Sequence, residues 1–199
     1  MSPQLILASS SPFRKQLLAK LNIPFETCSP NIDESAHRNE SPEVLVMRLA
    51  QEKAVVAASR YTEGLVIGSD QVAVINKRIV GKPLTHENAV KQLTQASNQI
   101  ITFYTGLTVH NISTGNNDSR VETFNVHFRT LTQEQIEYYL HTEQPYFCAG
   151  SFKCEGLGIA LFTQLEGKDP NTLVGLPLIT LIDMLALQGY HVLASNAVS

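Results

Sequence analysis

Short apolar runs alternate with amphipathic segments along the chain, and the apolar runs predict strands. Residues 4–8 and 65–67 are almost wholly apolar, which is typical of buried strands. The segments 99–111 and 120–129 are rich in β-forming residues and predict a long hairpin, with the polar residues 113–118 at its tip. Further strands are expected over residues 25–29, 72–75 and 159–162.

Other segments carry apolar residues at helical spacing. A side chain that can cap a helix precedes most of them, namely Ser11, Ser41, Thr85 and Thr132. Helices are therefore expected from residue 12 onward and over residues 42–60, 86–96, 133–141 and 177–188. Because helices and strands alternate around one antiparallel hairpin, the predicted class is α/β with a mixed β-sheet.

The composition is that of an ordinary globular protein. Of its 199 residues, 43% are apolar and 17% are charged, so a single domain over residues 1–199 can bury a core without disulfide support. The net charge of −3 excludes the global positive field that attracts long nucleic acids. Any site for an anionic ligand must therefore be built locally.

The three cysteines are Cys28, Cys148 and Cys154, an odd number without a CxxC pair. This pattern fits neither a disulfide framework nor a zinc site, so we expect reduced thiols in a cytoplasmic protein. The first residues lack the basic and apolar regions of a signal peptide. No apolar run reaches the ~20 residues that span a bilayer, so no membrane partner is expected.

The turn from the first strand into the first helix, at Ser9, is a candidate anion site. A helix N-terminus offers free N–H groups and a partial positive charge. Arg14 and Lys15 place two cations in the first turn, where they are unfavourable unless an anion is bound. Two interpretations fit these residues: the side chains bind phosphate, or they extend into water.

Lys53 interrupts an apolar stripe on the helix expected over residues 42–60. It shares that stripe with Val46, Leu49 and Ala57, where an apolar side chain is expected. A buried lysine needs an anionic partner or a ligand. A lysine at the edge of the stripe could instead extend its amine into water, and the sequence is compatible with both arrangements.

Asp70 follows the apolar strand 65–67 and is the leading catalytic candidate. Ligands collect at the carboxyl ends of strands in α/β sheets, where a carboxylate can bind a divalent metal or orient a water molecule. The alternative is an aspartate that stabilises a turn. Glu34, on the polar loop over residues 30–40, and Lys82, between two turn-forming residues, are weaker candidates when each is taken alone.

Together these features are the set of groups expected at a metal-assisted phosphoryl-transfer site. They comprise a helix start suited to anions, several cations, and carboxylates on short loops. The sequence has no GxxxxGK[ST] motif, which excludes a P-loop nucleotide site. It also lacks a histidine-rich metal cluster and the GxSxG elbow of serine hydrolases.

In order along the chain, these motifs resemble those of the Maf family of nucleotide pyrophosphatases. The matching segments are LILASSSPFRK at 5–15, DE at 33–34, QEKA at 51–54, GSDQ at 68–71, GKP at 81–83, AGSF at 149–152 and GLPL at 175–178. The resemblance implies an elongated mixed sheet with flanking helices and two lobes around a central cleft, similar to that of ITPase. It also implies hydrolysis between the α- and β-phosphates with a divalent cation, Mg²⁺ or Mn²⁺, and it allows a homodimer.

The resemblance also implies roles for individual residues. Asp70 matches the family's catalytic acidic residue, and Lys53 and Lys82 are expected to assist it. Ser9, Arg14 and Lys15 are expected to bind the substrate phosphates, and Asp70 with Glu34 to hold the metal. Asp70 could bind the metal, activate the attacking water, or do both through one bridging water.

A narrower resemblance, carried by Phe13, Gln71 and Glu155, is to the YceF-type subfamily, which acts on 7-methylguanosine triphosphate. Members that act on dTTP and UTP have Arg, Thr and Gln at these places. N7-methylation makes guanine cationic, so it attracts an aromatic face and a carboxylate that accepts from its N1–H and N2–H₂ groups. The alternatives are core packing of Phe13 against Leu17 and Leu21, and a solvated Glu155.

The expected activity is hydrolysis of 7-methyl-GTP to 7-methyl-GMP and pyrophosphate, as house-cleaning of modified nucleotides. One alternative is a pyrophosphatase for other triphosphates, such as dTTP and UTP. The other is a nucleotide-binding regulator of cell division with little turnover.

Overall fold

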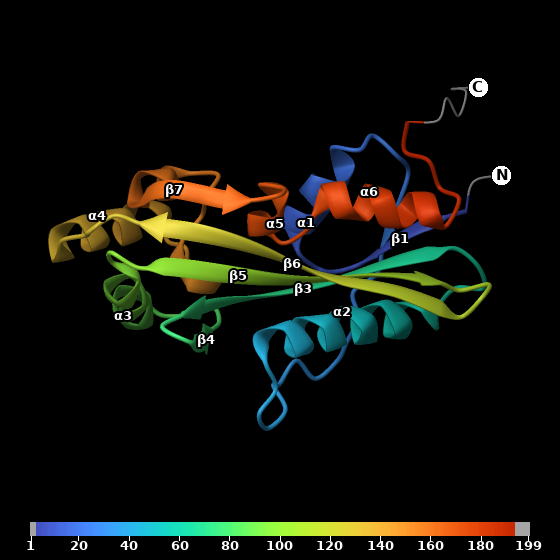
Figure 1. Cartoon of the computed structure of the whole chain (residues 1–199), viewed down its shortest axis with the longest axis horizontal. Coiled ribbons are helices and arrows are strands. Elements are labelled where there is room, and N and C mark those ends of the chain that lie inside the picture. Colours follow the sequence, from blue (N-terminus) through green and yellow to red (C-terminus); the bar gives the residue numbers. More distant parts are fainter. Residues whose placement is uncertain (1–2, 194–199) are drawn as a thin grey trace.

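The computed structural model describes residues 3–193. Within this range, one mixed sheet of seven strands runs along the molecule (Figure 1). The strands are β1 (Leu5–Ala8), β2 (Glu26–Thr27), β3 (Leu65–Ile75), β4 (Arg78–Val80), β5 (Ile100–Asn111), β6 (Asn116–Phe128) and β7 (Phe162–Gly167). Their order is β2–β1–β3–β5–β6–β7, with β4 on β3. β1 is parallel to β2 and β3, whereas the other pairs are antiparallel, which confirms the predicted mixed α/β class.

In the part of the chain that the structure describes, six α-helices and two short 3₁₀ segments flank this sheet. They are α1 (Pro12–Ala19), α2 (Pro42–Ala58), α3 (His86–Ala96), α4 (Gln133–Glu143), η1 (Ala149–Ser151), η2 (Leu157–Leu161), α5 (Asn171–Val174) and α6 (Leu178–Leu187). All four predicted caps form, because each side-chain oxygen accepts from a backbone N–H in the first turn. At Thr132 the cap is a reciprocal capping box with Gln135.

Helix α2 lies on one face of the sheet, and α1 and α6 lie on the other (Figure 1). Two glycines allow α2 to approach the strands closely. A Cβ atom at Gly68 of β3 would overlap the carbonyl oxygen of Ala50, and one at Gly106 of β5 would overlap that of Val46. The side chain of Lys53, one turn beyond Ala50 on α2, is thereby brought down onto β3.

The two largest apolar clusters lie at opposite ends of the sheet, and smaller ones lie beneath α2. At one end, α3 and α4 pack Leu93 and Leu140 with Phe103 and Phe128 of the hairpin. At the other end, α1 and α6 bury residues such as Leu18 with the apolar face of β1. These two parts have separate cores, so a cleft can lie between them without removing apolar packing from either.

The structure corrects three sequence-based boundaries. β3 is one strand through Ile75 rather than separate strands over residues 65–67 and 72–75, because its ladder with β5 runs unbroken from residue 65 to residue 74. The hairpin tip is shorter than predicted, since Asn116 already pairs with Asn111. The strand expected over residues 159–162 is a 3₁₀ segment followed by β7.

One side-chain contact accompanies that last difference. The Leu157 N–H, at the start of η2, donates to a carboxylate oxygen of Glu143 in α4 at 2.8 Å. The strand expected over residues 25–29 contracts to β2, and α5 is a helix that the sequence patterns did not predict. Within residues 3–193, no helix is both long and apolar enough to cross a bilayer.

Candidate active site

The site forms where the edge of β3 lacks a strand neighbour among the described residues. β1 pairs with β3 only as far as the Ala8–Gly68 register, and β4 begins at the Ala73–Val80 register. Between these positions, residues 69–72 of β3 are bordered on that side by the turn into α1 rather than by a strand. The site therefore does lie at the carboxyl end of a strand, but the strand is β1 and not β3.

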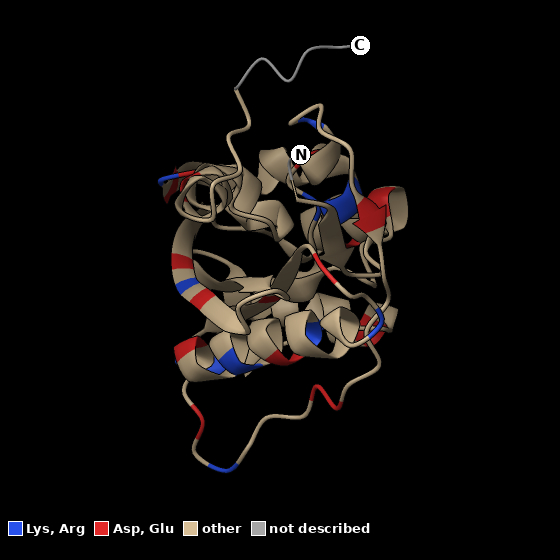
Figure 2. Ribbon diagram, turned by 90° about the vertical axis from the view of Figure 1, so that its right-hand side faces the viewer, with Lys and Arg blue, Asp and Glu red and all other residues tan. Residues whose placement is uncertain are grey.

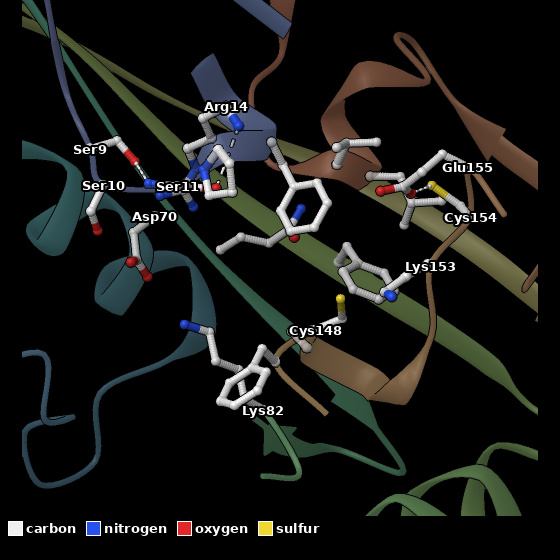
Figure 3. A pocket seen from close by; sticks show the side chains of 18 of the residues that line it. Ser9, Ser10, Ser11, Arg14, Asp70, Lys82, Cys148, Lys153, Cys154 and Glu155 are labelled. Carbon is white, nitrogen blue, oxygen red and sulfur yellow. Dashed lines mark hydrogen bonds between the residues drawn. The ribbon is translucent and has the colours of Figure 1, made fainter. Parts of the chain in front are cut away.

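A cavity of about 460 Å³ opens at this edge, between the two ends of the molecule. Its walls come from the β1–α1 turn, β3, α2, the Lys82 loop and the segment around η1. Figure 3 shows Asp70, Ser10 and Lys82 toward one end and Glu155 with Cys154 at the other. A ligand that fills the cavity would thus meet different chemistry at its two ends.

The centre of the charged end is a buried lysine between two carboxylates. Lys53 Nζ lies 2.6 Å from Asp70 Oδ1 and 2.7 Å from Glu34 Oε1. The Lys53 and Asp70 side chains are 8% and 9% exposed, whereas that of Glu34 is 61% exposed. Lys53 is therefore a paired core lysine and does not extend into water.

The alternation of β3 explains why Asp70 meets Lys53. Gly68 and Asp70 face α2, whereas Ser69 and Gln71 face the opposite side of the sheet. Asp70 lies directly opposite Gly106 of β5, in the ladder itself. It is thus held by the rigid backbone of a long strand, and the alternative role of a turn-stabilising aspartate does not apply.

Nearby cations act on the pKa of Glu34. Burial favours a higher pKa for this carboxyl group, but the hydrogen bond from Lys53 and the charges of Lys53, Lys82 and Arg14 outweigh it, so the pKa is lowered. Glu34 is thus an anion at neutral pH. For Arg14, desolvation lowers the pKa, and the charges of Asp70 and Glu34 act in the opposite direction.

Arg14 and Ser69 are fixed by the same carbonyl group. Arg14 Nε donates to the Gly175 oxygen at 2.8 Å, and Ser69 Oγ lies 2.9 Å from that oxygen. Gly175 has a φ of 104°, a left-handed conformation that favours glycine. The predicted GLPL motif therefore orients Arg14 toward the cavity that it lines.

Gln71 contributes from the other face of β3. Its Nε2 donates to Thr172 O at 2.7 Å and to Thr105 Oγ1 at 2.9 Å, and the residue lines the cavity. With both amide protons engaged, the carbonyl oxygen of Gln71 is left as the group that can accept from a ligand. This arrangement places Gln71 in the wall with a fixed orientation.

The residues expected to recognise the base also reach the cavity. Phe13 and Glu155 both line it, so Phe13 is a wall residue although it lies on the same helix as the buried Leu17. Glu155 is exposed, and Cys154 Sγ donates to its Oε2 at 3.3 Å. The structure thus brings together two side chains that are 142 positions apart in the sequence (155 − 13).

Ser9 and Lys82 also line the cavity, whereas Lys15 does not belong to its wall. Ser9 Oγ accepts from the Ser11 N–H at 3.1 Å, which shapes the turn into α1. Lys82 is exposed, and its ammonium group extends toward the charged end in Figure 3. Lys15 is exposed on α1, and its role in phosphate binding stays a prediction.

Four of the wall residues that the sequence did not identify lie close to the AGSF motif, namely Phe147, Cys148, Lys153 and Cys154. They flank the AGSF motif, and that proximity was the one signal that could have identified them. Burial raises the pKa of the Cys148 thiol, and it raises that of Cys154 to about 12. Both thiols are therefore protonated at neutral pH and are poor nucleophiles.

The donor set at the charged end fits a hard divalent cation. Asp70 and Glu34 each offer a second carboxylate oxygen besides the one that faces Lys53, and both residues line the cavity. Carboxylate oxygens together with substrate phosphates are the usual ligands of Mg²⁺ and Mn²⁺. Lys53 holds these two carboxylates close together, which suits a metal that they would share with a phosphate.

Acidic and basic residues are interspersed over the rest of the molecule (Figure 2). Helix α2 and the loop before it carry both signs. Arg14, Lys53 and Lys82, by contrast, all line one cavity. The positive charge there is therefore local, as expected for a chain with a net charge of −3.

Comparisons with known proteins agree with the motifs. The family model described as Maf-like protein matches residues 4–188. A relative from Aliivibrio fischeri (strain ATCC 700601 / ES114), named 7-methyl-GTP pyrophosphatase, is 60% identical over 193 residues, which cover 97% of this chain and 100% of the relative. A relative of the same name from Vibrio vulnificus (strain CMCP6) is 63% identical over 190 residues, covering 96% and 97%.

Among solved structures, that of the Staphylococcus aureus Ham1 protein aligns with a TM-score of 0.46 at 12% identity, covering 78% of this chain and 89% of that one. The match over residues 4–188 and the two relatives of at least 60% identity are sufficient to assign the family. This chain belongs to the Maf family.

Proposed function

We propose that this protein is a cytoplasmic pyrophosphatase that hydrolyses 7-methyl-GTP to 7-methyl-GMP and pyrophosphate and so removes a modified nucleotide. The observation that carries the proposal is the polarity of the cavity. Cations, carboxylates and the Phe13 ring line the cavity, and Glu155 lies at the end away from Asp70 (Figure 3). The names of the two relatives support the same substrate.

The charged end suits attack at the α-phosphorus. A water oxygen bonds to that phosphorus, the bond from it to the bridging oxygen breaks, and pyrophosphate leaves with the electron pair. Asp70, fixed in the β3 ladder, orients this water or accepts its proton. Arg14, Lys53 and Lys82, with Ser9 at the turn, line the cavity and balance the charge that develops on the phosphate oxygens. Lys15, outside the wall, is expected to add positive charge from the first turn of α1.

A divalent ion is part of this proposal. Mg²⁺ or Mn²⁺ held by Asp70 and Glu34 would polarise the phosphate oxygens and neutralise part of the triphosphate charge. Lys53, at 2.6 and 2.7 Å from these two carboxylates, positions both for this role.

Recognition of the base occurs at the other end. A 7-methylguanine ring is cationic, so stacking on Phe13 is more favourable than for an uncharged base. Its N1–H and N2–H₂ groups both donate, and the Glu155 carboxylate can accept from the two together. Gln71 presents its carbonyl oxygen from the β3 wall as a further acceptor.

The test is a pyrophosphate-release assay with 7-methyl-GTP, GTP, dTTP and UTP, each with and without Mg²⁺. We expect the highest kcat/KM for 7-methyl-GTP and loss of turnover without the metal. A higher kcat/KM for dTTP or UTP would assign the protein to a pyrimidine triphosphate instead. Tight binding of 7-methyl-GTP without release of pyrophosphate would instead indicate a nucleotide-binding regulator.

A further inference from the structure

A second group of metal-ligating side chains lies at the α3–α4 end of the molecule. His86, the first residue of α3, has its Nε2 atom 2.7 Å from Glu137 Oε2, and His141 Nε2 is 3.8 Å from the same oxygen. One ligand atom from each of the three residues lies within 4.8 Å of the others. None of the three is among the residues that line the nucleotide cavity.

We propose that His86, Glu137 and His141 form a binding site for a transition-metal ion of the Zn²⁺ class. This site differs in chemistry from the carboxylate pair at Asp70. Imidazole ligands favour zinc, copper and nickel, whereas carboxylates alone favour Mg²⁺ and Mn²⁺. The sequence analysis found no histidine-rich cluster because the fold, and not the chain order, brings His86 to α4.

The backbone already provides the spacing that such a site needs. Glu137 and His141 are four residues apart on α4 and therefore lie on one face of that helix. In a tetrahedral zinc site, ligand atoms lie roughly 3.3 Å apart, given bonds of ~2.0–2.1 Å. The separations of 2.7 and 3.8 Å from the shared Glu137 oxygen bracket that value, and all three ligand atoms lie within 4.8 Å of one another.

A hydroxyl group behind the cluster fixes the orientation of one ligand. Tyr146 Oη lies 3.0 Å from Nδ1 of His86, on the side of the ring away from Glu137. If Nδ1 carries the proton and donates to this oxygen, the Nε2 lone pair faces the other two ligands. Such outer contacts orient histidine ligands in metal sites generally.

The exposure of the three side chains suits an ion that enters from solvent. His86 and Glu137 are 34% and 37% exposed, and His141 is 74% exposed. The His86 and His141 rings stack with centroids 5.0 Å apart, so the more exposed ring already rests over the other. Three protein ligands leave a fourth position for water.

A metal ion bound here would affect the nucleotide cavity through two loops that connect the cluster to the cavity wall. His86 follows the loop that carries Lys82, and Tyr146 precedes the wall residue Phe147. The two loops are also joined by a hydrogen bond from the Leu84 N–H to Tyr146 O, at 3.0 Å. An ion on His86, Glu137 and His141 would therefore fix both loops to α4.

The test begins with protein stripped of metal by a chelator and then titrated with Zn²⁺ alone, in excess Mg²⁺, against a chromophoric competitor. One saturable zinc ion per chain is expected, with a rise in melting temperature of about 5 °C at ~100 times the dissociation constant. His141→Ala and Glu137→Gln should abolish saturable binding, and Tyr146→Phe should weaken it by ~10-fold.

Matched controls separate this site from others. His127→Ala removes a histidine that also faces a carboxylate, Glu166 at 3.3 Å, and should leave zinc binding unchanged. Asp70→Asn should leave it unchanged as well. Co²⁺ in place of Zn²⁺ should give a spectrum without a thiolate charge-transfer band, which excludes Cys148 and Cys154 as ligands.

Three outcomes would overturn the proposal. These are the absence of saturable binding to the intact chain, binding that persists in His141→Ala with unchanged affinity, and a thiolate band with Co²⁺. Because His141 is largely exposed, its variant should keep the melting temperature of the metal-free protein. A lower melting temperature would assign a folding role to the cluster. Loss or retention of zinc binding in Glu137→Gln would then decide whether the cluster also binds metal.

Discussion

Lys53 is the residue on which the charged end of the cavity depends. It is buried with Asp70 at 2.6 Å, and removal of one partner from such a pair typically costs about 3–5 kcal/mol. We expect Lys53→Met to lower the free energy of unfolding by about 3 kcal/mol, as measured by urea denaturation. Turnover in the pyrophosphate assay should fall by at least ~10²-fold.

A second substitution separates stability from chemistry. In Lys53→Met/Asp70→Leu both buried charges are replaced by apolar groups, so most of the lost stability should return while turnover stays lost. Glu34, which also contacts Lys53, is 61% exposed and tolerates the loss of its partner. Wild-type turnover in either variant would mean that the ion pair has no part in catalysis.

Glu155 is expected to decide between methylated and unmethylated guanine. Glu155→Gln keeps the size of the side chain but removes the charge that complements a cationic base. We expect kcat/KM for 7-methyl-GTP to fall by ~10-fold or more, and that for GTP to fall less. The matched control is Glu166→Gln, an acidic residue on β7 outside the cavity wall. An equal loss for both nucleotides would place the contact elsewhere.

At the scale of the elements, the close approach of α2 to the sheet sets the geometry of the site. A methyl group at Gly106 would overlap the carbonyl oxygen of Val46 and force α2 away from β5. We expect Gly106→Ala to destabilise the fold by about 2 kcal/mol in urea denaturation, as overpacking usually does. Turnover should fall as well, because α2 carries Lys53.

Gly81→Ala is the control for stability, since a Cβ atom there meets nothing within 4 Å. Its free energy of unfolding should equal that of the wild type within about 0.5 kcal/mol. Equal stability of the two variants would contradict the close contact between α2 and the sheet.

The loop that carries Glu34 is anchored to α2 by one arginine. Arg48 Nε and Nη2 donate to the two carboxylate oxygens of Glu40 at 2.7 and 2.9 Å, and Nη2 also donates to Ser35 O at 3.0 Å. The hydrogen bond from Arg48 is the main cause that lowers the pKa of Glu40 to about 2. The anchor thus holds residues 35–40, the segment that directly follows Glu34.

The lowered pKa of Glu40 determines how the stability of this anchor depends on pH. A lowered carboxyl pKa gives stabilisation that is complete above about pH 4.5, the unfolded value, and is lost as the pH falls through about 2. Amide exchange of residues 34–40, taken relative to α6, should therefore stay slow to below pH 4 and then accelerate. In Glu40→Gln it should be fast at every pH. Equal protection in the two proteins would contradict the anchor.

For the molecule as a whole, local sequence patterns predicted the helices and strands, whereas the contacts between them depend on the fold. The caps at Ser11, Ser41, Thr85 and Thr132 identified four helix starts, because capping depends on neighbouring residues alone. The misplaced Lys53 indicated a buried partner but could not name Asp70, since that contact depends on the approach of α2 to β3. That the strands expected over residues 65–67 and 72–75 form one strand was missed, because pairing with β5, a distant segment, sustains β3 through Asp70.

The family resemblance implied a central cleft, but the complete lining of the cavity lay beyond sequence reasoning. Phe147 and Lys153 carry no motif, and they reach the wall only because η1 packs beside β3. The His86–Glu137–His141 cluster was likewise invisible, since it joins two helices that are far apart in the chain. The sequence did indicate a local concentration of cations and carboxylates, because these residues belong to short motifs.

The phosphorus atom that water attacks is the most direct test of the mechanism proposed for this cavity. Hydrolysis of 7-methyl-GTP in ¹⁸O-labelled water, followed by mass spectrometry of both products, reports which phosphorus is attacked. We expect one label in 7-methyl-GMP, unlabelled pyrophosphate, and loss of both products with Asp70→Asn. Label in the pyrophosphate, release of orthophosphate, or normal turnover by Asp70→Asn would contradict attack at the α-phosphorus beside Asp70.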